Sequence, residues 1–503
     1  MTQHLPAMLF CIPLLTAISM PMIGLRHRGW CRPMALAAVW AMSVTAVVNL
    51  VVVLSSGEIR YEFGGWPAPI GIEWVADGLA SVMMTVICLI ASICLIYGGT
   101  VSPIPAGGRV VHYYTLILLL LSGLTGVVFA ADLFNVFVFL EVITLSVAAL
   151  VGMAGGKALV FAFRYLILAS IGATFYLLGV SFFYAATGTL NMADLAERVP
   201  ALLDSKAVIG GLVFMFIGLG IKMALMPLHG WLPDAYTFAP DSVSPLLSAL
   251  VTKVSLLAWA RILYWAVGVG SELDTTHILQ LVWVSGTVAA VVGAFLALTQ
   301  RDVKRMFAYG GISHIGLILI GVGQGNQTGL AGAMFYLIND AVMQATLFVV
   351  AGAAIHQYGV KTMEDLGRLR GRAPWIIGAI IIATMSMIGI PPTGGFFGKW
   401  YIILSALQSG NYLAVGAVMV STLLTLAYCI RLWVHVFGGD QVSPSEHRVE
   451  APVALRICVG TLSLSIIALG LCADRIVKVL LDATTSLALN SDLLNAFILK
   501  SFV

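Results

Sequence analysis

The feature that most constrains this chain is its series of apolar stretches, each long enough to cross a lipid bilayer. A bilayer core about 30 Å thick needs about 20 mostly apolar residues in a helix. Windows of that length predict fourteen spans, near residues 5–25, 34–54, 76–97, 111–130, 133–152, 160–187, 207–228, 242–263, 276–299, 306–322, 330–356, 374–407, 412–436 and 452–473. A less hydrophobic tail, residues 474–503, is expected to lie along the membrane surface or against a partner. The sequence therefore predicts an all-α, polytopic membrane protein.

Composition excludes several other classes of protein. Only 10% of the 503 residues are charged, against roughly a quarter in soluble proteins, which excludes a soluble globular chain. The net charge of +3 gives no electrostatic footprint for binding nucleic acid. The seven cysteines form no C-x-x-C motif or Cys/His cluster, and the sequence has no Walker A motif. We therefore expect no resident metal, no cofactor and no ATP-driven step.

Basic residues alternate between the loops, which predicts the orientation of the chain. Lys and Arg accumulate in the cytoplasmic loops of membrane proteins. Loops after odd-numbered spans hold sixteen of them, and the opposite side holds six. Both termini are then expected on the non-cytoplasmic side of a bacterial cytoplasmic (inner) membrane. The first stretch, residues 5–25, lacks a basic leader and a convincing cleavage site, so we expect it to be retained as the first span.

Two predicted spans are interrupted by proline and glycine, and each carries one lysine. The seventh reads GLGIKMALMP over residues 218–227, and the twelfth reads IPPTGGFFGK over residues 390–399. Interrupted segments at corresponding positions of two halves point to an ion site at mid-membrane. Because the two lie five spans apart, we predict two inverted five-helix repeats, spans 4–8 and 9–13. The expected divisions are residues 1–110 (spans 1–3), 111–263 and 276–437 (the repeats), and 438–503 (span 14 and the tail).

An ionisable side chain at the bilayer centre costs roughly 2.5–3.5 kcal/mol, so each one needs an explanation. Glu141 lies nine residues after Asp132, about 13 Å into the membrane. It is either a protonated or hydrogen-bonded carboxyl, or the partner of a buried lysine. Lys222, just before the break at Pro227, is the candidate partner. A lysine that alternates between a paired and a desolvated setting can carry a proton, whereas a fixed pair is only structural.

Four further candidates continue this series through the later spans. Lys253 lies mid-span, where it could take part in a proton path. The alternative is a lysine whose side chain extends to the membrane interface. His314 can relay a proton through its two ring nitrogens or can simply pack as a neutral histidine. Asp340 is an acid beside two amides in an apolar span, and Lys399 follows the twelfth-span break, where it could also reach water. Together the six residues predict a proton path, because each can hold or release a proton at membrane depth.

Three motifs, taken in order, resemble one known family. They are KMALMPLHGWLPDA (222–235), DVKRMFAYGGISH (302–314) and GIPPTGGFFGK (389–399). They are similar to the antiporter-like subunits shared by respiratory complex I, membrane-bound hydrogenases and multisubunit Mrp-type cation/proton antiporters. The segment FGGWPAPIGIEWVAD (63–77) looks most like the D subunit of the Mrp-type antiporters. The resemblance covers roughly spans 3 to 13 and implies fourteen helices with inverted repeats.

The resemblance also implies roles for individual residues. Glu141 and Lys222 match the coupled pair of the family, Lys253 its bridging lysine, His314 its mid-membrane histidine and Lys399 its terminal lysine. Span 11 departs from the pattern, because relatives often carry His and then Lys where this chain has Asp340 and Gln344. The connection from His314 to Lys399 then runs through Asp340 and water, or the second half is rewired or partly disabled.

The expected function is proton translocation within a multisubunit antiporter that exchanges protons for sodium or another monovalent cation. Its expected partners are other membrane subunits, protons, sodium and the lipid bilayer, and the chain is not expected to be an enzyme by itself. Three alternatives remain open. The protein could serve a redox-driven pump such as complex I or a membrane hydrogenase, it could couple protons to an inorganic-carbon transporter, or it could be an inactive scaffold.

Overall fold

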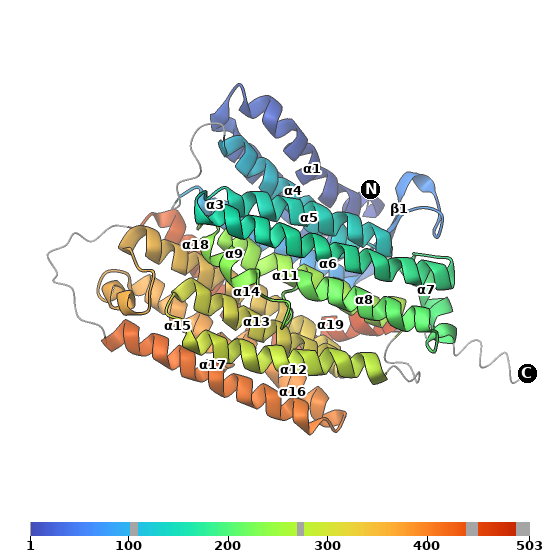
Figure 1. The fold of residues 1–503 in the computed structure, drawn as a ribbon. Helices are drawn as coiled ribbons and strands as arrows, with labels where there is room; N and C mark the ends of the chain where they lie inside the picture. Colours follow the sequence, from blue (N-terminus) through green and yellow to red (C-terminus); the bar gives the residue numbers. More distant parts are fainter. Residues whose placement is uncertain (1, 101–108, 269–275, 439–450, 489–503) are drawn as a thin grey trace, which may run out of the picture.

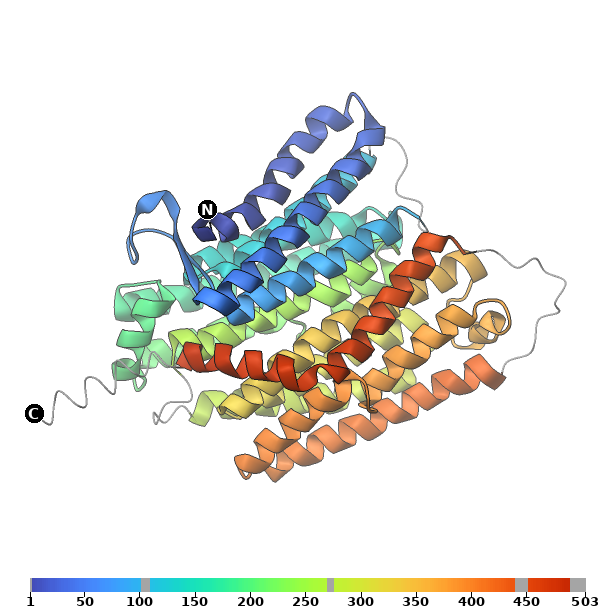
Figure 2. The same cartoon turned by 180° about the vertical axis from the view of Figure 1, so that it is seen from behind.

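The computed structural model describes residues 2–100, 109–268, 276–438 and 451–488, which form a bundle of long helices running side by side (Figures 1 and 2). The helices are α1 (Leu5–Gly24), α2 (Cys31–Ser56), α3 (Gly78–Gly98), α4 (Arg109–Phe129), α5 (Leu133–Gly152), α6 (Lys157–Thr187), α7 (Met192–Arg198), α8 (Lys206–Lys222), α9 (Leu232–Phe238), α10 (Ser244–Leu246), α11 (Thr252–Arg261), α12 (Thr276–Thr299), α13 (Val303–Val322), α14 (Gln327–Tyr358), α15 (Pro374–Ile388), α16 (Gly394–Gln408), α17 (Tyr412–Gly438), α18 (Val453–Leu471) and α19 (Ala473–Ala488). Two π-helical turns, η5 (Leu247–Val251) and η6 (Ile262–Ala266), flank α11, and η7 (Glu364–Leu369) is a 3-10 helix.

The predicted all-α membrane architecture is confirmed. Among the described residues, twelve helical segments are long and apolar enough to cross a bilayer. The other two predicted crossings are the interrupted ones. The seventh breaks where α8 ends at Lys222, and the twelfth breaks between α15 and α16 at residues 389–393. Breaks in spanning helices are tolerated where neighbouring protein or water satisfies the freed backbone groups.

A short β-hairpin marks one end of the bundle. Strand β1 (Ile59–Glu62) pairs antiparallel with β2 (Glu73–Ala76), with Ile59 opposite Ala76. We call this end, where α3 begins and α6 ends, the hairpin end, and the end that carries η7 the opposite end. The hairpin was not predicted, because two four-residue strands give too short a pattern to separate from a loop.

Local features recur in the two halves of the chain. Asp132 and Asp302 cap the first turns of α5 and α13, which are 20 residues long in both cases. Each cap also lies in a short backbone bridge, Asp132 with Asn191 and Asp302 with Thr362. Helices α6 and α14 end just before the second residue of each bridge, and each ends at a glycine in the left-handed conformation. These shared features support the predicted repeats over residues 111–263 and 276–437, and the division stays a prediction.

Small residues allow α6 and α8 to approach closely. A Cβ added to Gly218 would lie 2.5 Å from the carbonyl oxygen of Gly172, and one added to Gly179 would lie 2.5 Å from that of Gly211. Small residues at helix contacts are how membrane helices associate where lipid supplies no hydrophobic driving force. This contact holds α8, and with it Lys222, at a fixed distance from its neighbours.

We predict that Gly218→Val destabilises the protein by about 1–3 kcal/mol or more, because the added atoms overlap backbone that cannot move aside. Gly210→Val is the matched control, since it makes the same change in the same helix where a Cβ would meet nothing within 4 Å. Thermal unfolding of the purified protein in detergent measures both. Equal melting temperatures for the two variants would contradict the importance of the contact.

Candidate functional site

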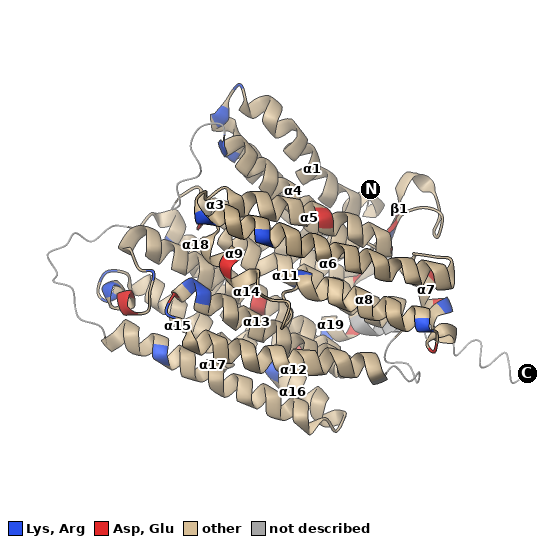
Figure 3. Ribbon diagram, in the orientation of Figure 1, with Lys and Arg blue, Asp and Glu red and all other residues tan. Residues whose placement is uncertain are grey.

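Charged residues are sparse along the bundle, as Figure 3 shows. Most candidates predicted from the sequence are buried, and they fall into three groups. The first is the pair Glu141 and Lys222, the second is the set of Lys253, Asp340 and His314, and the third is Lys399.

The pair joins α5 to the broken end of α8. The Lys222 ammonium donates to Glu141 Oε1 at 3.1 Å and also to the Thr144 hydroxyl. Only 5% of the Lys222 side chain is exposed, whereas 30% of Glu141 is exposed. The indole of Trp231 donates to the Ile221 carbonyl at 2.8 Å, and the Ala224 N–H donates to the same carbonyl at 3.1 Å, so this backbone group next to the break is satisfied. The structure thus contains the ion pair that the sequence suggested, with its carboxylate partly open to the outside.

The second group is a fork built on one carboxylate. Asp340 on α14 lies 2.8 Å from the Lys253 ammonium through Oδ2 and 2.7 Å from His314 Nδ1 through Oδ1. Lys253, Asp340 and His314 are all at most 2% exposed. Two charges of opposite sign and a titratable ring therefore share one buried site, and a proton gained or lost by one of them changes the charge balance of all three.

The backbone around Lys253 departs from regular α-helix. The π-helical turn η5 over Leu247–Val251 directly precedes α11, in which Lys253 is the second residue, and the Lys253 ammonium donates to the Ser248 carbonyl at 2.7 Å. A π turn widens the helix and leaves carbonyls without their usual partners, which is why such turns are frequent at functional sites. Here the turn supplies the Lys253 ammonium with a neutral acceptor, the Ser248 carbonyl, in addition to the carboxylate of Asp340.

Lys399 lies just after the second break and is also buried. Its ammonium donates to the carbonyls of Met387 and Ile388, at 2.8 and 3.2 Å, and to the Thr422 hydroxyl at 3.2 Å. Those carbonyls are at the end of α15, where the helix stops and leaves acceptors free. Within the described part of the chain, no hydrogen bond or ion pair joins Lys399 to the other five candidates.

Several buried polar atoms near His314 have no partner in the structure. They are Nε2 of His314, both amide atoms of Gln344 and the hydroxyl of Tyr336. The Tyr336 ring lies edge-on to the His314 ring at 5.7 Å, and a Cβ on Gly311 would lie 3.0 Å from Gln344 Nε2. Buried polar groups are costly unless they are hydrogen-bonded, so these atoms mark a place suited to internal water.

A buried ion pair near the hairpin end was not predicted from the sequence. Arg261 on α11 donates to Asp77, the residue that caps α3, at 3.0 Å and to the carbonyl of Val128. Both side chains are at most 2% exposed, and the guanidinium lies 5.0 Å from the Trp265 ring centre. Asp77 directly precedes an apolar helix, so its capping position was the available signal.

Two further acidic side chains, each in contact with two basic side chains, lie near the opposite end. Asp234 on α9 lies between Arg164 and Arg305, and Asp241 contacts Lys304 directly and His356 at 3.6 Å. These acids follow the seventh-span break, and two of their basic partners, Lys304 and Arg305, begin α13, so complementary charge in the two motifs was the available signal. They tie α6, α9 and α13 together rather than extending the buried series.

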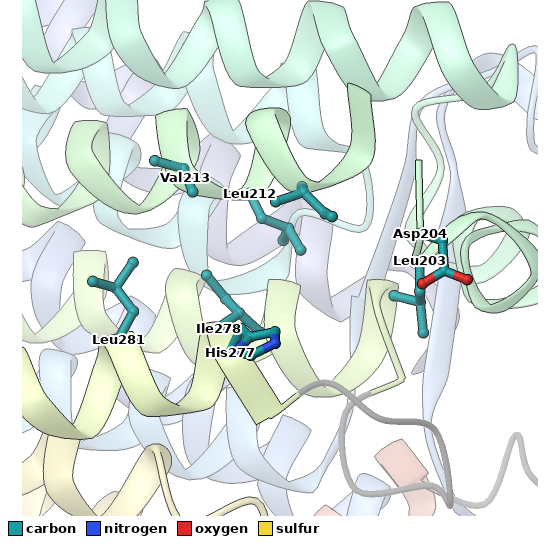
Figure 4. Close-up of a pocket in the computed structure, with 8 residues that line it drawn as sticks. Leu203, Asp204, Leu212, Val213, His277, Ile278 and Leu281 are labelled. Atoms are coloured by element: carbon teal, nitrogen blue, oxygen red, sulfur yellow. The ribbon is translucent and has the colours of Figure 1, made fainter. Parts of the chain in front are cut away.

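A surface cavity of about 210 Å³ lies between α8 and α12 (Figure 4). Leu212 and Val213 line it from α8 and Leu281 lines it from α12, with Asp204 near its rim. None of the six candidates lines this cavity, so it lies outside the buried series. Among the residues that the structure describes, no three His, Cys, Asp or Glu side chains gather closely enough to hold a metal ion.

Comparison with known proteins identifies the family. A family model described as NADH:quinone oxidoreductase/Mrp antiporter, TM, matches residues 130–425. The N subunit of NADH-quinone oxidoreductase from Desulforudis audaxviator is 37% identical over 95% of this chain and 98% of that protein. The D subunit of the Na(+)/H(+) antiporter from Alkalihalophilus pseudofirmus is 30% identical over 90% of each. A chain of the membrane-bound sulfane sulfur reductase, an archaeal respiratory membrane complex, aligns with a TM-score of 0.89 over 96% of this chain and 97% of that chain, at 29% identity. The resemblance seen in the motifs is therefore confirmed, and the chain belongs to the family of membrane subunits shared by NADH:quinone oxidoreductases and Mrp antiporters.

Proposed function

We propose that this chain translocates protons as one component of a multisubunit, Mrp-type antiporter that exchanges protons for sodium or another monovalent cation across the bacterial cytoplasmic membrane. The observation that carries the proposal is the series of six titratable groups within the helix bundle, each in contact with a polar partner in the protein. The identity to the D subunit of a Na(+)/H(+) antiporter supports the assignment to antiport. The chain itself supplies the proton path, and other subunits supply the cation exchange.

In the proposed path a proton is first held by Lys222 while the ammonium is paired with Glu141. Opening of this pair leaves a desolvated ammonium, which favours release of the proton toward Lys253 through internal water. Asp340 balances the charge on Lys253 and can hand a proton to His314 through the hydrogen bond between them. Water held by Gln344 and the free His314 nitrogen would continue the path toward Lys399.

A second candidate is the same proton path driven by a redox reaction in partner subunits. Two findings favour it. The relative from NADH-quinone oxidoreductase is 37% identical, and the structural neighbour of TM-score 0.89 belongs to a respiratory membrane complex. Everted vesicles that hold the complex distinguish the two functions. Sodium-dependent proton movement without an electron donor supports antiport, whereas proton movement that requires an electron donor supports the redox-driven pump.

We predict that Glu141→Gln and Lys222→Met each abolish proton movement without loss of the assembled complex, because each removes a proton-binding group of the first pair. The measurement is the fluorescence of a ΔpH-sensitive dye in everted vesicles after sodium is added. Glu197→Gln, on the exposed surface of α7, is the matched control and retains full activity. Normal transport by either variant of the pair would overturn the proposed path.

We predict that Asp340→Asn lowers the free energy of unfolding by about 3–5 kcal/mol, because it leaves Lys253 buried without its counter-charge. The double variant Lys253→Met with Asp340→Leu removes both charges and recovers much of that stability, as replaced buried pairs often do. Thermal unfolding in detergent measures both variants.

Transport by the same two variants separates a structural role from a proton-carrying one. If the fork carries protons, the double variant is stable and still inactive. A stable double variant with normal transport would show that the ion pair serves only to hold α11 against α14.

A further inference from the structure

A buried amide on α14 joins the two sides of the break between α15 and α16. The Asn339 Nδ2 group donates to the Ser386 hydroxyl at 3.1 Å, and that hydroxyl donates to Asn339 Oδ1 at 3.2 Å. The Gly395 N–H donates to the same hydroxyl at 3.2 Å. Ser386 belongs to the last turn of α15, and Gly395 belongs to the first turn of α16. We call Asn339, Ser386 and Gly395 the break clamp, because together they tie both helix ends to α14.

The break clamp is fully buried and closely packed. Asn339 and Ser386 are both 0% exposed. A Cβ on Gly394 would lie 2.5 Å from Asn339 Oδ1, and one on Gly395 would lie 1.8 Å from the Ser386 carbonyl oxygen. Glycine at both positions lets the first turn of α16 approach the amide and the end of α15. Buried polar groups are costly when their hydrogen bonds are lost, so the clamp favours this one arrangement of the two helix ends.

The break clamp flanks the groups that hold Lys399. The ammonium donates to the carbonyls of Met387 and Ile388, which are the two residues after Ser386. Lys399 itself lies four residues after Gly395 in α16, which is about one helical turn. The acceptors and the lysine are therefore each attached to a clamp residue. A change in the distance between Ser386 and Gly395 would move the acceptors away from the ammonium.

Neutral acceptors make Lys399 sensitive to small changes of position. Among the described residues, no acidic side chain lies within 4 Å of its ammonium, which donates to two carbonyls and a hydroxyl. Its titratable neighbours are Cys429 on α17, His314 on α13, and Tyr336 on α14, which lies against Gly398. Hydrogen bonds weaken steeply with distance and angle. The hold on the Lys399 proton therefore depends on how the end of α15 is placed.

Helix α14 carries the break clamp and the fork on consecutive residues. Asp340, which follows Asn339, contacts Lys253 and His314. Because a helix has 3.6 residues per turn, consecutive side chains leave it in directions about 100° apart. One position therefore serves the fork while the next serves the break. A shift of α14 at Asp340 would be transmitted to the ends of α15 and α16 through Asn339.

We propose that Asn339 is a positioning residue for Lys399. Through Ser386 and Gly395, its amide holds the ends of α15 and α16 in the arrangement in which backbone carbonyls bind the ammonium. Asn339 thus sets how readily Lys399 releases a proton, although it carries no proton itself. The proposal rests on the proposed proton path, and it adds a mechanical link between the fork and the last lysine of that path.

The pH profile of transport in everted vesicles tests the break clamp. Asn339→Leu keeps the approximate size of the side chain and removes both hydrogen-bonding atoms, and Ser386→Ala removes the hydroxyl that they share. Each variant is expected to lower the pH of half-maximal, sodium-dependent proton movement by about one unit, which corresponds to the loss of one hydrogen bond to a charged group. The double variant shifts the profile no further, because the two residues act as one unit.

A second buried Asn–Ser pair supplies the matched control. Asn49 donates to the Ser81 hydroxyl at 2.9 Å and joins α2 to α3, away from the six candidates. Asn49→Leu is expected to lower the melting temperature and to leave the pH profile unchanged. If Ser386→Ala also keeps the original profile, whatever its effect on stability, the clamp is only structural and the proposal is overturned.

Melting of the purified chain tests the break clamp without transport. The dependence of melting temperature on pH, measured between about pH 6 and pH 10, reports protonation of buried groups because proton binding is linked to stability. Ser386→Ala is expected to change this dependence in the natural chain and to leave it unaltered in a Lys399→Met background. The same change in both backgrounds, or no change in the natural chain, overturns the proposal. Since this measurement needs neither sodium nor partner subunits, failure of the clamp is distinguishable from failure of the proposed antiport.

Discussion

The absence of hydrogen-bonding solvent inside a bilayer is the constraint that orders this structure. Each charge at depth must find its partner in protein or in internal water. Glu141 pairs with Lys222, and Asp77 pairs with Arg261. Asp340 contacts both Lys253 and His314. Lys399 instead uses carbonyls released where α15 stops. The helix breaks and the π turn follow from the same need, because each supplies acceptors that a regular helix would keep for itself.

The two halves meet this constraint differently. Counting from the capping aspartates, the ninth residue is Glu141 in the first half and Gly311 in the second, and the twelfth is Thr144 and then His314. The second half thus lacks the carboxylate that pairs with the lysine of the first, and Gln344 occupies the space beside Gly311. The acid appears on α14 instead, as Asp340.

The sequence predicted those parts of the fold and site that depend on local rules. Apolar length located the spans, proline and glycine located both breaks, and distance from a capping aspartate placed Glu141 at depth. The Asp340 fork could not be predicted, because His314 and Lys253 reach it from other helices and the π turn η5 shifts the register of α11. Apolar windows also located span 14, which the structure has as α18, but not the helix α19 that follows it, because charged residues interrupt the apolar side of α19. Helix α19 of the predicted tail packs against α3 and α14, and residues 489–503 of that tail lie outside the described residues.

Asp340 occupies the boundary between the halves, and this position gives the fork its consequence. Lys253 belongs to the last crossing of the first predicted repeat, whereas His314 and Asp340 belong to the second. A carboxylate shared between them cannot fully neutralise both when His314 is protonated, so a proton on one side weakens the hold on the other. In the proposed proton path, a change of charge at Lys253 therefore alters the charge balance at His314 without movement of a whole helix. An ion pair confined to one half could not couple the charges of the two halves in this way, whereas a carboxylate shared across the boundary can.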